Sequence, residues 1–285
     1  MTPADRTALE RLALRVRERT VRLASDGGCF LGASLSCTDL LVTLYERFLR
    51  VSPATLEDPA RDYLFLSKGH DVPALYSLFV EKSWMPSALL ARHLEPGSNV
   101  YWHPNRGIPG VEFHSGSLGH LLSVAMGVAL EVRMSGGTNR VVVVLGDGEL
   151  NEGSIWEALL VSRALRLANL FLAVDRNGFQ ANARTEDLVP LEPLAAKFEA
   201  FGCAVRRVDG HDFEALDAAL AGFPYAADAP SVLIADTVRG KGLPSIESRA
   251  DRWFCDFTAG EVEALVEELH GASEARLSSE GLVVR

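Results

Sequence analysis

The feature that most constrains this chain is a series of short apolar, β-branched runs separated by amphipathic segments of helical length. Examples are VVVVL at 141–145 and SVLIAD at 231–236. Runs without alternating polar residues are typical of strands buried on both faces of a parallel sheet. Parallel neighbours need crossover connections, and right-handed crossovers build an open, doubly wound sheet. The sequence therefore predicts an α/β fold with a mainly parallel sheet and helices on both faces.

The same pattern can be followed along the chain to place each element. Strands are expected at 62–67, 140–148, 169–177, 203–209 and 231–237. Helices are expected at 4–25, 37–49, 71–82, 118–134, 153–167, 191–202, 212–222 and 259–270. Residues 1–245 are predicted to form one domain, and 246–285 to add one helix and a polar tail.

Composition argues against several classes of protein. A net charge of −10 makes a nucleic-acid partner unexpected, since such proteins usually cluster basic residues. The four cysteines are scattered without a Cys-x-x-Cys pair, which favours reduced thiols over a disulfide framework or a zinc site. The N-terminus lacks a signal-peptide pattern, and the apolar stretches are too short to cross a bilayer. We expect a soluble, cytoplasmic protein without a membrane partner.

Two polar residues end neighbouring predicted strands. Asp147 lies between Gly146 and Gly148, and Asn177 follows the next strand thirty positions later. Ligands collect beyond the carboxyl ends of such strands, and a carboxylate with an amide oxygen suits Mg²⁺, which completes its shell with water and phosphates. The glycines would let the backbone approach a phosphorylated ligand, and the N-terminus of the 153–167 helix would favour its negative charge.

Either turn alone has a simpler interpretation. Gly-Asp-Gly and Asn-Gly are common turn signals, and each on its own is more often structural than functional. The two together, each closing a strongly apolar strand at crossover spacing, favour a metal that holds a diphosphate.

The residues around these turns resemble a known family. GDGELNEGSIWEAL and NLFLAVDRNGFQ together resemble the thiamine-diphosphate fingerprint of transketolases. Further segments match in the same order, namely SKGHDVPALYSL at 67–78, WHP at 102–104, PGVEFHSGSLGH at 109–120, LEPLAAKFEAFGCAVRRVDGHD at 191–212 and DTVRGKGLP at 236–244. The chain is similar to the separately encoded N-terminal half of a split transketolase. The resemblance implies the thiamine-diphosphate-binding fold, and within it the type of domain that binds the cofactor's diphosphate.

The resemblance also implies roles for individual residues. Mg²⁺ would be ligated by Asp147, Asn177 and the backbone carbonyl of Phe179, and Gly148 would offer its N–H to a phosphate. The implied catalytic residues are His70, His103 and Glu152. The implied cofactor-binding residues are His70, Gly116, Leu118, Gly146, Asp147, Gly148, Glu149, Asn177 and Lys241.

Simpler interpretations remain open for some of these residues. Glu152 could be a first-turn carboxylate stabilised by the helix dipole, and Lys241 could be a solvent-exposed loop cation. His93, His211 and His270 are assigned to surface or structural positions.

The sequence departs from the family pattern at two aromatic positions. GCFLGASLS at 28–36 has Phe30 where transketolases carry a histidine, and WFC at 253–255 has Phe254 in place of another. His120 also replaces the usual glutamine. A phenyl ring cannot make the hydrogen bonds that a histidine makes to a substrate hydroxyl or a phosphate. Leaving a buried hydroxyl unpaired costs about 1–3 kcal/mol. We therefore hypothesise that substrate choice has moved from ordinary pentose phosphates towards a smaller, less hydroxylated or carrier-bound acceptor.

The resemblance further implies a partner. Thiamine diphosphate would supply the carbanion chemistry and the protein its binding and orientation. The glutamate that contacts the aminopyrimidine would come from a companion pyrimidine-binding subunit, in an α₂β₂ heterotetramer.

Three other interpretations compete with this one. A decarboxylating 2-oxo acid dehydrogenase-like component, which passes a two-carbon unit to a carrier, shares the metal motif. A non-catalytic cofactor-binding subunit is a second alternative. A dinucleotide-binding domain is disfavoured, since no Gly-x-Gly-x-x-Gly opens a helix after a strand.

Overall fold

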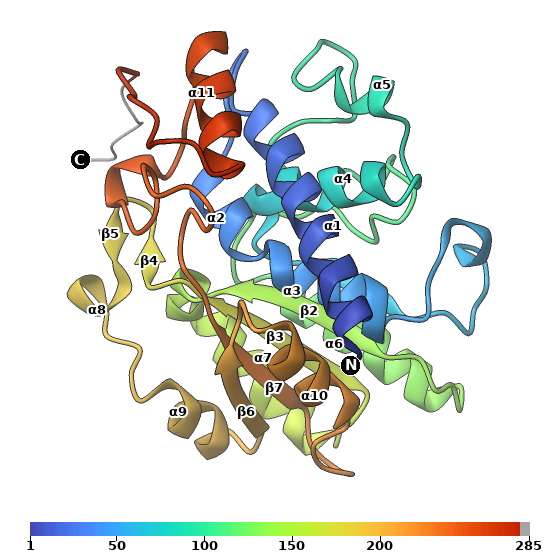
Figure 1. Cartoon of the computed structure of the whole chain (residues 1–285). Helices are drawn as coiled ribbons and strands as arrows, with labels where there is room; N and C mark the ends of the chain where they lie inside the picture. The colour runs from blue at the N-terminus through green and yellow to red at the C-terminus, as the bar shows by residue number, and fades with distance from the viewer. Residues whose placement is uncertain (280–285) are drawn as a thin grey trace.

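A parallel sheet organises residues 1–279, which the computed structural model describes. Its five strands lie in the order β1-β2-β3-β7-β6, and every neighbouring pair is parallel. Their bounds are β1 (Tyr63–Leu66), β2 (Val141–Gly146), β3 (Leu170–Arg176), β6 (Ala204–Asp209) and β7 (Ser231–Asp236). The predicted fold class is confirmed, because helices cover both faces of this sheet (Figure 1).

Alternate residues of each strand face opposite sides, and in β1, β2, β3 and β7 both sides are largely buried, whereas β6 is partly exposed. On one side, Val142 and Val144 of β2 join an apolar cluster with α1 (Pro3–Arg22), α3 (Thr38–Thr43), α4 (Val72–Glu81) and α10 (Phe213–Ala221). On the other side, Val141 and Val143 join a cluster with α6 (Leu121–Met134), α7 (Gly153–Ala164) and α9 (Leu194–Ala200). Burying one such side chain contributes roughly 1.5–3 kcal/mol, so an uninterrupted valine run suits a central strand.

The helix at the C-terminal end packs against the N-terminal part of the chain. Helix α11 (Ala259–Leu269) begins with a capping box between Thr258 and Glu261. Its Val262 and Leu265 share an apolar cluster with Val21, which lies near the end of α1. Figure 1 shows α11 beside α1. The segment beyond 245 is therefore packed onto the same body as the sheet.

The structure differs from the predicted elements mainly in the connections. The expected helix at 37–49 is α3 followed by a π-helical turn, η1 (Leu44–Phe48), and the expected helix at 191–202 begins only after Pro193. Short elements that the periodicity did not indicate are α2 (Leu31–Ser36), α5 (Ser87–Leu90), α8 (Thr185–Leu188) and the antiparallel pair β4 (Phe179–Gln180) and β5 (Ala183–Arg184). Single 3₁₀ turns are η2 (Pro53–Thr55), η3 (Gly69–Asp71), η4 (Gly148–Asn151) and η5 (Ala250–Arg252).

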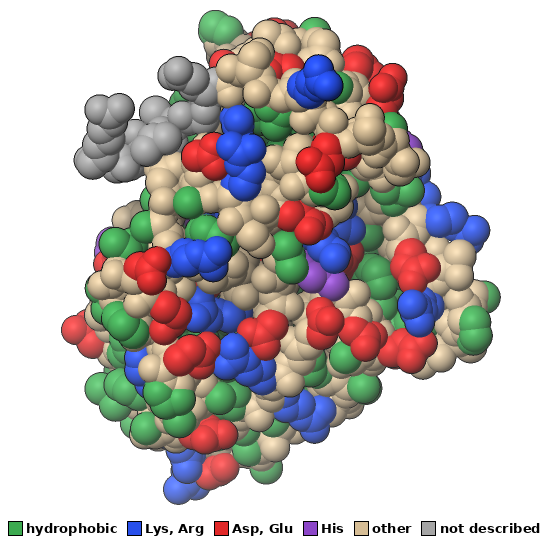
Figure 2. All heavy atoms as spheres, turned by 60° about the vertical axis from the view of Figure 1, so that its left-hand side comes forward, with side chains coloured by type: hydrophobic (Ala, Val, Ile, Leu, Met, Phe, Trp, Pro, Cys, Tyr) green, Lys and Arg blue, Asp and Glu red, His purple; other side chains and the backbone are tan. Residues whose placement is uncertain are grey.

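The surface carries charges of both signs. On the face in Figure 2, acidic and basic side chains are interspersed. Within residues 1–279, no helix is both long and apolar enough to cross a membrane.

Candidate active site

A cavity of about 380 Å³ opens at the carboxyl ends of the strands. Lys68 follows β1, Asp147 follows β2, Asn177 follows β3 and Arg239 follows β7, and all four line this cavity. The cavity also brings together most of the residues that the sequence predicted for the site, namely His70, His103, Gly116, Leu118, Gly146, Gly148, Glu149 and Phe179.

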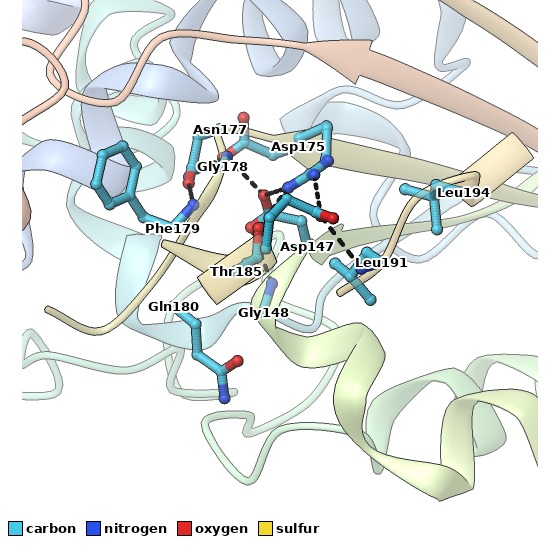
Figure 3. A network of polar contacts seen from close by, with 12 residues as sticks. Asp147, Gly148, Asp175, Asn177, Gly178, Phe179, Gln180, Thr185, Leu191 and Leu194 are labelled. Atoms are coloured by element: carbon cyan, nitrogen blue, oxygen red, sulfur yellow. Dashed lines mark hydrogen bonds and ion pairs between the residues drawn. The ribbon is translucent and has the colours of Figure 1, made fainter. Parts of the chain in front are cut away.

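Asp147 is held where the ends of β2 and β3 meet. Its Oδ2 accepts a hydrogen bond from the Gly178 N–H at 2.6 Å and another from Arg176 Nη1 at 2.8 Å. The side chain is almost fully buried. Burial raises the pKa of the Asp147 carboxyl to about 6, and the Arg176 guanidinium opposes this shift. Figure 3 shows Asn177 and Phe179 on the turn that follows β3, next to Asp147.

Asn177 is oriented by a buried carboxylate. Its Nδ2 donates to Asp175 Oδ2 at 3.0 Å and to Ser36 Oγ at 3.2 Å, while its Oδ1 accepts from the Phe179 N–H at 3.0 Å. Burial alone would raise the pKa of Asp175, but its contact with the buried Lys68 ammonium holds that pKa below its ordinary value. Lys68 also pairs with Asp71 at 2.5 Å. The carboxamide oxygen is therefore presented on the side of Phe179.

Two glycines are required by close approaches inside the cavity. Gly116 has a φ of +127°, and a Cβ at this position would lie 2.3 Å from His103 Cδ2. A Cβ on Gly148 would lie 2.9 Å from Gln180 Cβ. Side chains at either position would fill space at the site.

His70 and His103 lie around Phe30. The ring of Phe30 is 5.3 Å from that of His70 and 6.4 Å from that of His103, between centroids. Burial, together with the nearby Lys68 and His103, lowers the pKa of His70 to about 3, and burial also lowers the pKa of His103. Both imidazoles are therefore neutral near pH 7, and each has one N–H donor and one acceptor nitrogen.

The two phenylalanines that replace family histidines pack against each other. Phe30 and Phe254 meet edge to face with centroids 5.1 Å apart, and Trp253 lies 5.1 Å from Phe30. Trp102 extends the group, 6.0 Å from Phe254. Phe30 and Trp253 line the cavity, and Phe254 and Trp102 lie outside its lining. We define the four residues, Phe30, Trp102, Trp253 and Phe254, as the aromatic wall. The sequence identified the two replacements but not their contact.

Several predicted features lie elsewhere or differ in detail. Lys241 is not brought to the site: it lines a separate cavity with Arg17 and His211. Glu152 is an exposed N-cap residue of α7 outside the cavity lining, so its catalytic role stays a prediction. The Gly148 N–H, expected to face a phosphate, donates to Asp147 Oδ1 at 2.8 Å. The 3₁₀ turn η4 also separates the end of β2 from α7, so the start of α7 does not line the cavity.

The sequence reasoning missed two buried cations in the cavity, Lys68 and Arg239. The available signal was their position, since each follows a predicted strand within a few residues. A charged residue near the carboxyl end of a buried parallel strand has a fair chance of facing the ligand crevice.

The chemistry of these residues fits a magnesium diphosphate. Asp147, Asn177 and the Phe179 carbonyl form an all-oxygen set, as a hard cation prefers. Among residues 1–279, no group of three or more His, Cys, Asp or Glu is placed to hold a metal. The set proposed here differs from such a cluster, because it contains only one carboxylate beside an amide oxygen and a backbone carbonyl. It would leave the remaining coordination positions of the metal to phosphate and water. The glycine approaches and the Arg239 cation suit the phosphates of such a ligand.

Comparison with known proteins decides the family. Residues 18–276 match the family described as "Transketolase, thiamine diphosphate binding domain". The chain belongs to the transketolase family. A protein of Actinobacillus succinogenes, named as a subunit of apulose-4-phosphate transketolase, is 37% identical, with 92% of this chain and 95% of that protein covered. The 6-deoxy-6-sulfo-D-fructose transketolase subunit SqwG of Clostridium sp. is 36% identical, with 88% and 89% covered.

Solved transketolases share the fold. The enzyme from Leishmania mexicana superposes with a TM-score of 0.83 at 22% identity, and the one from Campylobacter jejuni with 0.80 at 26%. This chain covers 41% and 43% of those two chains. The transketolase resemblance predicted from the sequence is confirmed, as is the assignment to the part of the family that binds thiamine diphosphate.

Proposed function

We propose that this chain is the diphosphate-binding subunit of a two-component transketolase that depends on thiamine diphosphate and Mg²⁺. It transfers a two-carbon ketol unit from a ketose phosphate donor to an acceptor. The observation that carries the proposal is that Asp147 and Asn177 lie together at the carboxyl ends of two adjacent strands. The Gly178 N–H, next to Asn177 in the chain, donates a hydrogen bond to Asp147 Oδ2. The all-oxygen set at this point suits Mg²⁺.

The chain's own residues have distinct tasks in this reaction. Asp147, Asn177 and the Phe179 carbonyl hold the metal, and Gly116 leaves room beside His103. When bound, thiamine diphosphate supplies the electron sink for cleaving a ketose carbon–carbon bond. The neutral imidazoles of His70 and His103 donate protons to substrate oxygens or accept protons from them. Proton transfer of this kind is worth typically 10²–10⁴-fold in rate.

A companion subunit completes the site. The chain covers only about two fifths of the solved transketolases that it matches, while relatives of its own length are named as subunits. The companion supplies the pyrimidine-binding part, and an α₂β₂ heterotetramer in the cytoplasm is the expected assembly.

Reconstitution tests this proposal directly. The purified chain, the companion, thiamine diphosphate and Mg²⁺ together should convert a ketose phosphate and an aldose acceptor, while neither protein should do so by itself. The variant Asp147→Ala should lose activity and cofactor binding in calorimetry. Asp187→Ala, which removes an exposed carboxylate on α8, is the matched control and should behave as wild type. Full activity of the single chain, or release of CO₂ from pyruvate by the pair, contradicts the proposal.

Substrate choice follows from the aromatic wall. Phe30 lines the cavity, and Phe254 packs against it from outside the lining. Neither ring offers a hydrogen bond where family members carry histidines, so a substrate hydroxyl that faces Phe30 is left unpaired at a cost of about 1–3 kcal/mol. The names of the two relatives contain ketoses other than xylulose 5-phosphate, namely apulose 4-phosphate and 6-deoxy-6-sulfo-D-fructose. We infer that this chain disfavours the pair xylulose 5-phosphate and ribose 5-phosphate.

The double variant Phe30→His/Phe254→His tests this inference. It should raise kcat/KM for that sugar pair by tenfold or more. Phe113→His, at an exposed phenylalanine outside the cavity lining, should leave the same ratio unchanged. Wild-type activity on the pair at the level of ordinary transketolases is the outcome that contradicts a changed specificity.

A further inference from the structure

Arg176 places a cation directly against the proposed metal carboxylate. It is the last residue of β3, its side chain is 7% exposed, and its Nη1 donates to Asp147 Oδ2 at 2.8 Å. Asp147 supplies the one carboxylate among the three proposed metal ligands. A guanidinium group therefore neutralises the negative charge that this ligand set offers to a metal.

The two oxygens of Asp147 have different partners. Oδ2 accepts from the Gly178 N–H at 2.6 Å as well as from Arg176, which engages both of its lone pairs. Oδ1 accepts from the Gly148 N–H at 2.8 Å, which uses one lone pair and leaves the other for a metal. Because two backbone N–H groups also hold the carboxylate, it keeps its position without the arginine.

The other contacts of Arg176 fix its side chain. Nη2 donates to Glu186 Oε1 at 2.6 Å, Nε donates to Glu192 Oε1 at 3.4 Å, and Nη1 also donates to Thr185 Oγ1 at 2.6 Å. Figure 3 shows Thr185 beside Asp147 in this network. Every nitrogen of the guanidinium group has an acceptor, so the cation is in place before any metal arrives.

A fixed positive charge beside a metal ligand opposes the binding of a divalent cation. Coulomb repulsion grows with the product of the charges and with the loss of solvent, so a buried guanidinium is an effective opponent. Glu186 and Glu192 carry compensating charges, but their side chains are 40% and 37% exposed, so water screens them. A diphosphate would bring negative charges of its own to the metal and offset the guanidinium.

We propose that Arg176 keeps the metal site weak for a bare divalent cation, so that the metal enters together with the diphosphate. Arg176 is a positioning residue in this scheme, because it acts on the metal through Asp147. The inference rests on the proposed function, in which Mg²⁺ and the diphosphate of the cofactor share this site. If Arg176 served only to hold the turn after β3 to α8, its loss would weaken metal binding or leave it unchanged.

Metal titration of the cofactor-free chain tests the proposal. Mn²⁺, which takes the same oxygen ligands as Mg²⁺, is the probe, and electron paramagnetic resonance measures the free ion. Arg176→Gln removes the charge but keeps an N–H donor, and it should bind Mn²⁺ at least about tenfold more tightly than wild type. Arg176→Lys keeps the charge and should bind Mn²⁺ as weakly as wild type. Weaker or unchanged Mn²⁺ binding in Arg176→Gln overturns the proposal, as does an equal gain in Arg176→Lys.

Two controls locate the ion and separate local charge from net charge. Adding Asp147→Asn to the Arg176→Gln variant should abolish the gain in Mn²⁺ affinity. Arg207→Gln removes a positive charge from the same network, in which Arg207 pairs with Glu192 at 3.0 Å and with Asp236 at 2.8 Å. It should leave the Mn²⁺ affinity near that of wild type. A gain in Arg207→Gln as large as in Arg176→Gln contradicts a specific role for Arg176.

Stability measurements give a second readout with Mg²⁺ itself. A ligand that binds only the folded chain raises the urea midpoint of unfolding. Mg²⁺ alone should raise the midpoint of Arg176→Gln, whereas wild type should need Mg²⁺ and thiamine diphosphate together. Equal stabilisation of both chains by Mg²⁺ alone overturns the proposal. If Arg176→Gln is unfolded without metal, Mg²⁺ should restore its native circular dichroism spectrum, and failure to do so is equally contrary to the proposal.

The two proposals fail in different ways. Suppose that wild type binds thiamine diphosphate with Mg²⁺, but Arg176→Gln leaves the Mn²⁺ affinity unchanged. The role of Arg176 is then overturned and the proposed function stands. If Arg176→Gln instead tightens Mn²⁺ binding while wild type has no affinity for thiamine diphosphate with Mg²⁺, the proposed function is contradicted and the effect of Arg176 on the metal site stands.

Discussion

Asn177 donates from Nδ2 to Asp175 Oδ2 at 3.0 Å, and this bond decides which end of the carboxamide faces Phe179. Asp175 is itself fully buried, and Lys68 is the cation that pairs with it. The geometry of the proposed metal site therefore depends on a buried ion pair behind it. Asp175 thus positions Asn177, a proposed metal ligand, without being one of the proposed ligands itself.

The variant Asp175→Asn should destabilise the chain strongly. It removes one of the two carboxylates that pair with Lys68, and breaking a buried ion pair costs about 3–5 kcal/mol. The free energy of unfolding from urea titrations measures this loss. Ser36→Ala is the matched control, since it removes one 2.6 Å hydrogen bond to the same carboxylate and no charge. Its loss should be about 1–3 kcal/mol. Equal losses in the two variants would contradict an ionic role for Asp175.

Gly116→Ala should impair the site more than it impairs the fold. The new Cβ would lie 2.3 Å from His103 Cδ2, so the imidazole must move. Gly136→Ala is a suitable control, because Gly136 has a φ of +70° but nothing within 4 Å of the position that a methyl group would take. A left-handed conformation costs a non-glycine residue about 1–2 kcal/mol. Both variants should lose stability in urea, but only Gly116→Ala should lose thiamine diphosphate affinity in calorimetry. Equal effects on affinity would show that His103 is not displaced.

The titration of His70 should make stability depend on pH. Its pKa in the fold is about 3, against about 6.5 in the unfolded chain. Below about pH 6.5 the unfolded chain binds a proton that the folded chain does not, so stability falls as the pH drops towards 3. The side chain keeps 20% of its exposure, and solvent holds the slope below the maximum of about 1.4 kcal/mol per pH unit.

His70→Gln should flatten this part of the stability profile. The measurement is the free energy of unfolding in urea at several pH values between 4 and 7, roughly the range that separates the two pKa values. His120→Gln replaces an exposed histidine outside the cavity lining and should leave the slope as in wild type. An unchanged slope in His70→Gln would contradict the depressed pKa of this imidazole.

The parts of the site that the sequence predicts are those that local patterns determine. Asp147 and Asn177 end strongly apolar strands, and parallel pairing brings Gly146 beside Asp175, which places the two turns together. Glycines at turns and strand ends are likewise visible in the sequence.

Other parts depend on how loops fold over the sheet, which periodicity does not encode. Arg239 and Lys241 are two positions apart in one loop, yet they line different cavities. Their sequence context gives no reason to prefer either as the buried cation. Phe30 and Phe254 could each be identified as replacements, but their contact arises only because the segments around Cys29 and Cys255 pair as an isolated bridge.

His211 anchors the loop that carries Arg239. Its Nδ1 lies 2.8 Å from Asp39 Oδ2, and its Nε2 accepts from the Val238 N–H at 2.8 Å, so the imidazole donates to the carboxylate and accepts from the loop. The histidine, assigned from the sequence to a surface or structural position, thus ties the residue before Arg239 to the core. Asp39 is fixed in turn by Arg17, through two hydrogen bonds of 2.9 and 2.7 Å.

Replacing this imidazole should therefore loosen the loop before it affects the sheet. In His211→Ala, amide hydrogen exchange at Val238 should speed up by tenfold or more, because a hydrogen bond worth about 0.5–1.5 kcal/mol is lost and water gains access. The exchange rates of the β2 amides should change only by the factor that corresponds to the change in the free energy of global unfolding. His270→Ala removes an exposed histidine that pairs with Glu18 at 3.1 Å and should leave Val238 protected. If the Val238 amide stays equally protected in His211→Ala, other contacts hold this loop, and Arg239 does not depend on His211 for its position.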